Sequence, residues 1–144
     1  FAMDSAAMPL AGEERASPMA VKVGNPHAIF FVPDCDEVEL ERLGPIIEHD
    51  AAFPERVNVN VASIHDGAIK LRVWERGVGL TRACGTGACA TGVAAIRQGK
   101  VRSPVTVHLP GGPLTIAWAP GEPIIMTGGT TYVFKGFADW SSFG

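Results

Sequence analysis

The chain has 144 residues and a formal net charge of −3, with 47% hydrophobic and 19% charged residues. This length predicts one domain, and the composition is typical of a folded globular protein rather than a disordered one. Basic residues form no run and the longest apolar runs are far below the roughly 20 residues of a membrane helix. We therefore expect neither a nucleic acid nor a membrane as a partner.

The three cysteines, Cys35, Cys84 and Cys89, form an odd set. The first residues lack the basic and apolar stretches of a secretory signal peptide. This combination favours reduced thiols and predicts a cytoplasmic protein. The histidines are scattered singly, so we expect no metal site. We interpret residues 1–18 as a leader or as non-native residues, and residues 19–144 as the folded domain.

The first half of the domain predicts strands around one helix. Residues 19–32 indicate two strands broken by a Gly-Asn-Pro turn. Residues 36–49 carry apolar side chains at helical spacing, and we expect Asp36 to be the N-cap and Pro45 to interrupt the helix. Residues 56–75 alternate apolar and polar side chains on both sides of a His-Asp-Gly turn, which predicts a β-hairpin.

The second half predicts one further helix and four short strands. The helix is expected over residues 86–98, where small side chains allow close packing. The strands are expected over 105–109, 114–118, 124–128 and 131–137, with residues 130–144 as a closing strand and tail. The predicted fold class is α+β, in which a curved, mostly antiparallel sheet or a barrel-like wrap surrounds a central hydrophobic helix.

Cys84 lies in an Ala-Cys-Gly-Thr-Gly turn at the predicted start of that helix. The turn lacks the lysine of a Walker loop and does not match the dinucleotide-binding fingerprint. Backbone N–H groups at a helix start favour an anion such as a carboxylate, and the same position lowers the pKa of a thiol. A thiolate there is suited to act as a nucleophile or as a base. The alternative is that Cys84 is a small buried core residue.

Four motifs in this order resemble the C-terminal half of diaminopimelate epimerases. They are GNPHAIF (24–30), FPERVNVN (53–60), ERGVGLTRACGTGACA (75–90) and LPGG (109–112). TYVFKGF (131–137) resembles the closing strand of that family. The resemblance implies an isomerase without pyridoxal phosphate, metal or another cofactor. Two cysteines would act as acid and base to interconvert LL- and meso-diaminopimelate, in lysine and peptidoglycan-precursor biosynthesis.

The resemblance also implies roles for individual residues. Cys84 would be the catalytic thiol of this half, and Gly85 and Thr86 would offer backbone donors to the substrate. The contacts to the amino and carboxyl groups at the distal, non-reacting end of the substrate would come from Asn25, Asn58, Glu75 and Arg76. An arginine can clamp a carboxylate through two hydrogen bonds, and a glutamate can pair with an ammonium group. The alternative for these four residues is an ordinary place in a turn, a strand or a surface ion pair.

The chain departs from the family in one respect. Members have two similar domains, and the first carries the partner cysteine in a glycine-flanked motif that is not found here. We expect this chain to be one half of the site, to be inactive alone, to need the missing N-terminal domain and to self-associate as a homo-oligomer. Two alternatives stay open: a proline or hydroxyproline racemase-type enzyme, and a non-catalytic ligand-binding domain of the same fold.

Overall fold

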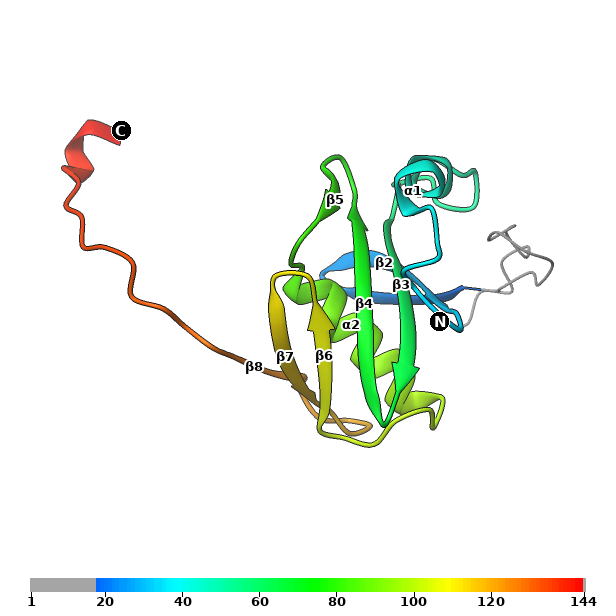
Figure 1. Cartoon of the computed structure of the whole chain (residues 1–144). Coiled ribbons are helices and arrows are strands. Elements are labelled where there is room, and N and C mark those ends of the chain that lie inside the picture. The colour runs from blue at the N-terminus through cyan, green and yellow to red at the C-terminus, as the bar shows by residue number, and fades with distance from the viewer. Residues whose placement is uncertain (1–17, 144) are drawn as a thin grey trace.

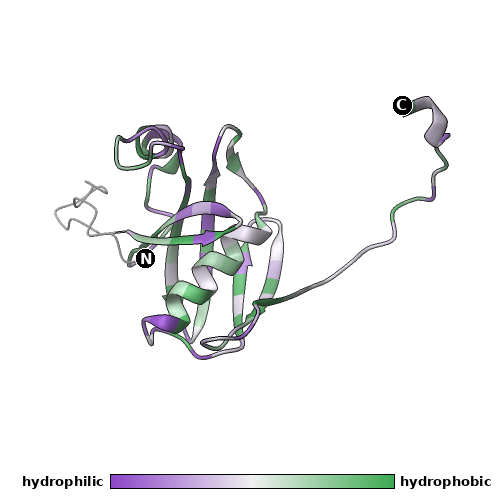
Figure 2. Cartoon of the chain, turned by 180° about the vertical axis from the view of Figure 1, so that it is seen from behind, coloured by the Kyte–Doolittle hydropathy of each residue, from purple (hydrophilic) through white to green (hydrophobic). Residues whose placement is uncertain are grey.

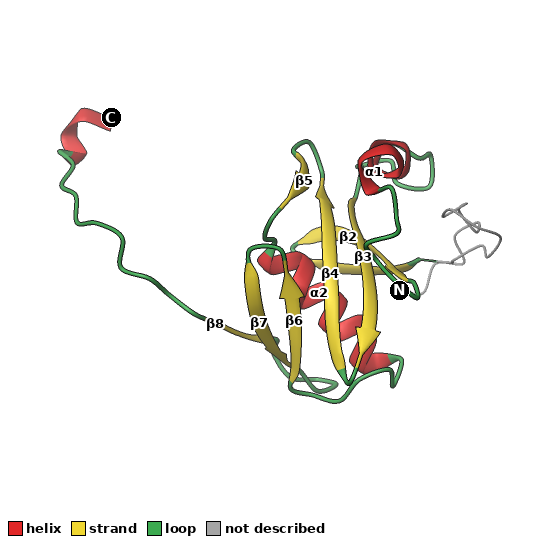
Figure 3. Cartoon of the chain, in the orientation of Figure 1, coloured by secondary structure: helices red, strands yellow, loops and turns green. Residues whose placement is uncertain are grey.

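The computed structural model describes residues 18–143, so the expected leader lies outside the described residues except for Pro18. One sheet contains all the strands of the described chain, in the order β1-β2-β3-β4-β6-β7-β8, with β5 paired to β4 (Figures 1 and 3). The strands are β1 (Met19–Val23), β2 (Asn25–Phe31), β3 (Asn58–His65), β4 (Ala68–Glu75), β5 (Gly79–Thr81), β6 (Val105–Leu109), β7 (Gly112–Ala117) and β8 (Ile125–Gly128). The helices are α1 (Leu40–Glu48), α2 (Gly85–Arg97) and the short 3-10 helix η1 (Trp140–Phe143).

The sheet is mixed but mostly antiparallel. Only β2 with β3 and β4 with β6 pair in parallel among the described strands. The other five pairings are antiparallel. A parallel pair needs a crossover connection, and the two helices supply it: α1 lies between β2 and β3 in the chain, and α2 lies between β4 and β6. The predicted α+β fold class is confirmed.

Helix α2 is the central helix that the sequence predicted. It contacts β1, β2, β3, β4, β6 and β7, and Figure 2 shows it lying across the sheet with hydrophobic and neutral residues along its length. Most of its residues from Gly87 to Ala95 are alanine, glycine or another small residue, and all of these are buried. A Cβ atom on Gly92 would lie 2.9 Å from the Ile116 side chain. Small side chains therefore let the helix approach the sheet closely.

Helix α1 covers the opposite face of the sheet. Its apolar stripe packs with residues of β2 and β3 in one buried cluster, which includes Leu43, Ile47, Phe30, Val59 and Val61. Because neighbouring residues of a strand point to opposite faces, Asn60, which lies between Val59 and Val61, faces α2 instead. This arrangement directs the side chain of Asn60 into the interior beside α2, where it is fully buried.

The start of α1 differs from the prediction. The helix begins at Leu40, Glu39 occupies the N-cap position without a side-chain hydrogen bond, and the chain continues in helical conformation through Pro45. Asp36 is not the N-cap, because its carboxylate pairs with Lys70 of β4 instead. No helix of the described residues is long and apolar enough to cross a membrane.

The end of the chain also differs from the prediction. The expected closing strand over residues 131–137 is not formed: β8 ends at Gly128, and the chain then leaves the sheet without regular structure until η1. Figure 1 shows this segment extending away from the sheet. Strands require a hydrogen-bonding neighbour, and this segment has none within the described chain. Its large apolar side chains are 70–92% exposed, namely Tyr132, Val133, Phe134, Phe137, Trp140 and Phe143.

Candidate active site

Cys84 occupies the N-cap position of α2 in an extended conformation. Its Sγ atom accepts a hydrogen bond from the backbone N–H of Gly87 at 3.4 Å and lies 3.6 Å from Thr86 Oγ1. The side chain is buried, with 7% of its surface exposed. The start of α2 therefore holds the Cys84 thiol beside the Gly87 backbone N–H and the Thr86 hydroxyl.

The direction of the pKa shift at Cys84 contradicts the sequence-based expectation. Burial raises the pKa of the Cys84 thiol, the carboxylate of Glu75 raises it further, and the hydrogen bonds from Thr86 and Gly87 oppose this rise only in part. The helix start does not make Cys84 acidic, because the cost of removing a thiolate from water outweighs these hydrogen bonds. The thiol is therefore the favoured form, and Cys84 is prepared to donate a proton.

Asn25 extends the site from the first residue of β2. Its Nδ2 atom donates to Thr86 Oγ1 at 3.3 Å, and its Oδ1 atom lies 3.0 Å from Nε2 of His27. The side chain thus connects the Cys84 turn to a histidine that is only 1% exposed. Burial lowers the pKa of His27 to about 4, so its imidazole is neutral at pH 7.

Asn58 joins two turns of the site through its side chain. Its Nδ2 atom donates to the carbonyl of Pro26 at 2.9 Å, and its Oδ1 atom accepts from the backbone N–H of Arg76 at 2.9 Å. The side chain is 4% exposed. Both polar ends of Asn58 are thus engaged with backbone, and Asn58 sets the position of the turn that carries Arg76 relative to the turn that carries Asn25.

Glu75 is the last residue of β4, and Arg76 directly follows it. Glu75 accepts a hydrogen bond from Thr81 Oγ1 at 2.6 Å, and its carboxylate is close enough to raise the pKa of Cys84. Arg76 is exposed, and its guanidinium donates to the carbonyl of Glu55 at 2.9 Å. The structure therefore brings a carboxylate and a guanidinium to the side of the domain on which the Cys84 thiol lies.

Glu48 is a positioning residue of this turn that the sequence analysis did not identify. Its carboxylate accepts from Trp74 Nε1 at 2.8 Å and from the backbone N–H of Gly77 at 2.9 Å. Burial is the largest single influence and raises the pKa of Glu48, but these two hydrogen bonds together with the nearby His49 and Arg56 hold the pKa below its usual value. The sequence contained only a weak indication of this role, because Glu48 simply follows the apolar stripe of α1, one helical turn after Gly44.

Gly87 is required for the close packing of α2 against β3. A Cβ atom at this position would lie 2.7 Å from Asn60 Oδ1 and 3.2 Å from Cys84 Sγ. Any larger residue would push the helix start away from the sheet and move the thiol. The second glycine after Arg82 in the motif therefore has a steric role in the site.

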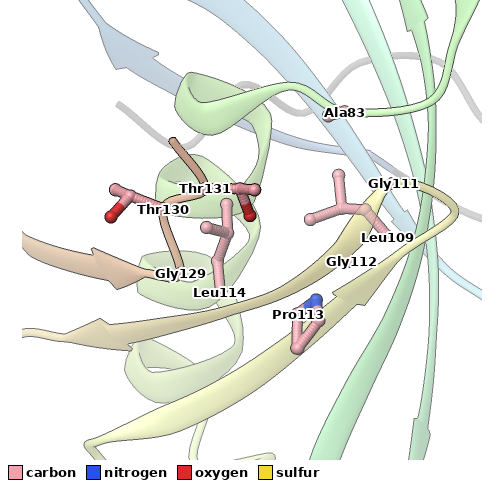
Figure 4. Close-up of a pocket in the computed structure, with 9 residues that line it drawn as sticks. All are labelled: Ala83, Leu109, Gly111, Gly112, Pro113, Leu114, Gly129, Thr130 and Thr131. Carbon is pink, nitrogen blue, oxygen red and sulfur yellow. The ribbon is translucent and has the colours of Figure 1, made fainter. Parts of the chain in front are cut away.

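A cavity of about 310 Å³ lies beside the Cys84 turn, between the β6–β7 turn and residues 129–131 (Figure 4). The backbone N–H of Gly111 donates to the carbonyl of Arg82 at 2.7 Å, and this bond holds the β6–β7 turn against the residues that precede Cys84. The lining residues are Ala83, Leu109, Gly111, Gly112, Pro113, Leu114, Gly129, Thr130 and Thr131. None of them carries an ionisable side chain, so the chemistry of the site lies at Cys84 and not in this cavity.

The other two cysteines are buried and unpaired. Cys89 lies within α2, and burial raises the pKa of its thiol. Cys35 accepts a hydrogen bond from Ser63 Oγ at 3.4 Å, away from the α2 start. Its Sγ atom and the carboxylates of Asp34 and Asp36 form the one group of potential metal ligands in residues 18–143. Asp36 is already paired with Lys70, and nothing else in this group indicates a metal.

Comparison with known proteins gives one consistent family. A sequence model of the diaminopimelate epimerase family matches residues 19–133. A curated diaminopimelate epimerase from Rhizorhabdus wittichii is 66% identical over 145 residues, which cover 100% of this chain and 53% of the relative. The diaminopimelate epimerase of Sphingopyxis alaskensis is 65% identical, over 99% of this chain and 53% of the relative. The chain thus spans about half the length of these relatives.

Solved structures support the fold. A PhzC/PhzF phenazine-biosynthesis protein from Clostridium difficile superposes with a TM-score of 0.51 at 16% identity, over 65% of this chain and 34% of that protein. A PhzF-family protein from Enterococcus faecalis superposes with a TM-score of 0.50 at 17% identity, over 73% of this chain and 39% of that protein. At these identities the likeness concerns the fold alone.

Proposed function

Because this chain belongs to the diaminopimelate epimerase family, we propose that it supplies one half of an epimerase active site that interconverts LL- and meso-diaminopimelate without a cofactor. The observation that carries this proposal is the position of Cys84 at the start of α2, with its thiol on the Gly87 N–H and beside Thr86. The enzyme would act in the cytoplasm, in lysine and peptidoglycan-precursor biosynthesis.

In this mechanism Cys84 exchanges a proton with the α-carbon from one face of the substrate. A thiolate on the opposite face removes the α-proton, the electron pair of the broken C–H bond moves toward the substrate carboxylate, and the Cys84 S–H donates its proton to the α-carbon. The reverse reaction exchanges the two roles. Backbone N–H groups of Gly85 and Thr86 would stabilise the developing charge on the carboxylate. The raised pKa of Cys84 supports its role as the proton donor.

The remaining residues would bind the two ends of the substrate. The exposed guanidinium of Arg76 is suited to a carboxylate, and Glu75 to an ammonium group. Asn25 lies at the open edge of the site beside Thr86 and would contact the reacting end. Both polar atoms of the Asn58 side chain are hydrogen-bonded to backbone groups. This supports a role in which Asn58 positions the Arg76 turn for substrate binding.

The second thiol would come from an N-terminal domain outside this chain. Cys35 is fully buried on the α1 side of the sheet, and Cys89 lies inside α2, so neither can face Cys84 across a substrate. The exposed apolar side chains of residues 132–143 offer a surface that such a domain would cover. The chain alone is therefore expected to lack epimerase turnover.

Incubation of the chain with LL-diaminopimelate in heavy water tests this function. We expect no meso-isomer, because one of the two proton-transfer groups is absent. We expect slow exchange of the α-hydrogen for deuterium, followed by proton NMR, only with the isomer whose α-hydrogen faces Cys84, because its thiolate can remove and return a proton on one face; meso-diaminopimelate is therefore incubated in parallel. Cys84→Ala should abolish the exchange, and Cys89→Ala, the matched control on the same helix, should retain it.

Two outcomes would contradict the proposal. Formation of the meso-isomer by the chain alone would exclude the two-half mechanism, and exchange that survives in Cys84→Ala would exclude Cys84 as the reacting group. Protection of Cys84 from alkylation separates the substrate classes: diaminopimelate should protect it, whereas protection by proline instead would indicate the racemase-type alternative.

A further inference from the structure

A line of hydrogen bonds leads from the interior of the domain to the Cys84 thiol. Its inner end is Asn60 on β3, whose Nδ2 atom lies 3.1 Å from Nδ1 of His27. The other ring nitrogen of His27 lies 3.0 Å from Asn25 Oδ1, and Asn25 Nδ2 donates to Thr86 Oγ1 at 3.3 Å. Thr86 Oγ1 lies 3.6 Å from Cys84 Sγ, where the line ends.

Two backbone carbonyls fix the orientation of the Asn60 amide. The two hydrogens of its Nδ2 atom are shared among three acceptors, the carbonyls of Asn58 at 3.1 Å and Ala28 at 3.3 Å and Nδ1 of His27. An amide oxygen in the same place would face two carbonyl oxygens, which is repulsive, so the nitrogen must occupy it. The opposite end, Asn60 Oδ1, is buried without a hydrogen-bond partner.

This orientation determines the direction of every later hydrogen bond. An amide nitrogen only donates, so His27 Nδ1 must accept, and a neutral His27 then carries its hydrogen on Nε2. His27 Nε2–H donates to Asn25 Oδ1, which turns the Asn25 amide so that its nitrogen donates to Thr86. The oxygen of Thr86 is then an acceptor, and its own hydrogen is free to point at Cys84 Sγ.

We propose that Asn60 is a positioning residue that holds neutral His27 in the Nε2–H tautomer, so that the line of hydrogen bonds points toward Cys84 Sγ and stabilises its thiolate. The unpaired Asn60 Oδ1 supports this assignment, because a buried unpaired acceptor costs stability and is retained only where the other end of the amide is needed. The inference rests on the proposed function only in taking Cys84 as the reacting thiol.

Other ionisable groups act on the two ends of this line. Glu75 raises the pKa of Cys84, and the Cys89 thiol lies close enough for Cys84 to affect its pKa. Burial is the largest cause and lowers the pKa of His27, the contact with Asn60 and the carboxylate of Glu75 raise it, and Arg76 lowers it; burial prevails and keeps the ring neutral. Burial and Glu75 raise the pKa of Cys84, and the hydrogen bond from Thr86 lowers it. This hydrogen bond therefore stabilises the thiolate.

The tautomer can be observed directly in the 144-residue chain. Long-range ¹H–¹⁵N correlation spectra at pH 7 should show His27 with its hydrogen on Nε2. In Asn60→Asp the carboxylate would accept from Nδ1–H, so the spectrum should show the hydrogen on Nδ1. A wild-type spectrum with the hydrogen on Nδ1 would overturn the proposal without any variant.

The effect on Cys84 is measured by the pH profile of its alkylation with iodoacetamide. Thr86→Val should slow alkylation at pH 8 about fivefold, the effect of losing one hydrogen bond to the thiolate. Asn60→Ala should slow it in the same direction, because His27 is no longer held in one tautomer. In the double variant, Asn60→Ala should add nothing to Thr86→Val, since its effect passes through Thr86.

Ser63→Ala is the matched control, because Ser63 is a fully buried polar residue of the same strand that contacts Cys35 instead of His27. It should leave both the tautomer and the alkylation profile unchanged. Additive effects of Asn60→Ala and Thr86→Val, or the same slowing in Ser63→Ala, would overturn the proposal. None of these measurements uses diaminopimelate, so they can succeed or fail independently of the epimerase assay.

Discussion

His27 and Cys84 are both neutral because burial acts on them in opposite directions. Burial lowers the pKa of the His27 imidazole and raises that of the Cys84 thiol, since each charged form would lose its hydration. Neither shift follows from the local sequence. A histidine after a Gly-Asn-Pro turn and a cysteine before Gly-Thr-Gly are compatible with exposed positions, and only the packing of α2 over β2 and β3 buries them.

We expect the stability of the domain to fall in acid because of His27. Its pKa is about 4 in the folded state, against 6.5 for an unperturbed histidine, so the unfolded chain binds more protons between these pH values. The free energy of unfolding should therefore drop as the pH falls from 6.5 to 4, by roughly 3 kcal/mol. Urea unfolding at a series of pH values measures this change.

His27→Gln should remove much of this pH dependence, whatever its effect on stability at pH 7. His65→Gln provides the control, because His65 is exposed at the end of β3. An unchanged slope in His27→Gln would show that other groups cause the acid sensitivity.

At the scale of elements, periodicity correctly predicted α1, α2 and seven strands of the sheet, but it missed β5 and predicted a strand over residues 131–137 that is not formed. The start of α1 also differs from the prediction, because the carboxylate of Asp36, a typical N-cap side chain, pairs with Lys70 on β4. Pro45 does not end the helix, because α1 is held by its contacts with β3, β4 and β5. Tertiary contacts therefore override the local start and stop signals in this helix.

Gly44 makes the contact between α1 and β4 possible. A Cβ atom on Gly44 would lie 2.5 Å from the Trp74 ring, and Trp74 cannot move freely because its indole donates to Glu48. Alanine is the better helix former by about 1 kcal/mol, but overpacking costs about 1–3 kcal/mol. We expect Gly44→Ala to lower the free energy of unfolding by about 1 kcal/mol, the midpoint of these opposing effects, measured by chemical denaturation.

Ile46→Ala on the same helix is the control, because Ile46 is 60% exposed. It should change the stability by no more than about 0.5 kcal/mol. A Gly44→Ala domain as stable as the wild type would mean that the α1–β4 contact can relax.

At the scale of the whole molecule, the chain spans about half the length of its curated relatives and carries an exposed apolar segment. The segment after β8 carries aromatic side chains that are largely exposed, among them Tyr132, Phe134, Phe137 and Trp140. Soluble monomers rarely expose such a set without a partner. Residues 131–137 were predicted to form a strand, but no strand of the described residues lies beside them.

We expect the chain to self-associate through this segment. Light scattering should show an average mass that rises with protein concentration, because association removes the exposed aromatic surface from water. Replacement of Phe134 and Phe137 by serine should reduce this rise without changing the unfolding transition, since both side chains are at least 79% exposed. A monodisperse monomer at all concentrations would contradict the prediction.

By itself, the sequence predicted most of the strand and helix pattern, the family and the position of the Cys84 turn at a helix start, because periodicity, turn residues and sequence motifs are properties of short stretches of the chain. Only the tertiary structure decided how the site is assembled. The parallel pairing of β2 with β3 sets His27 beside Asn58, and α2 then covers both strands. The hydrogen bonds of Asn60 and the burial of Cys84 depend on this packing of α2 over the two strands. Both bring together residues that are distant in sequence, and residue types alone do not specify which residues become neighbours.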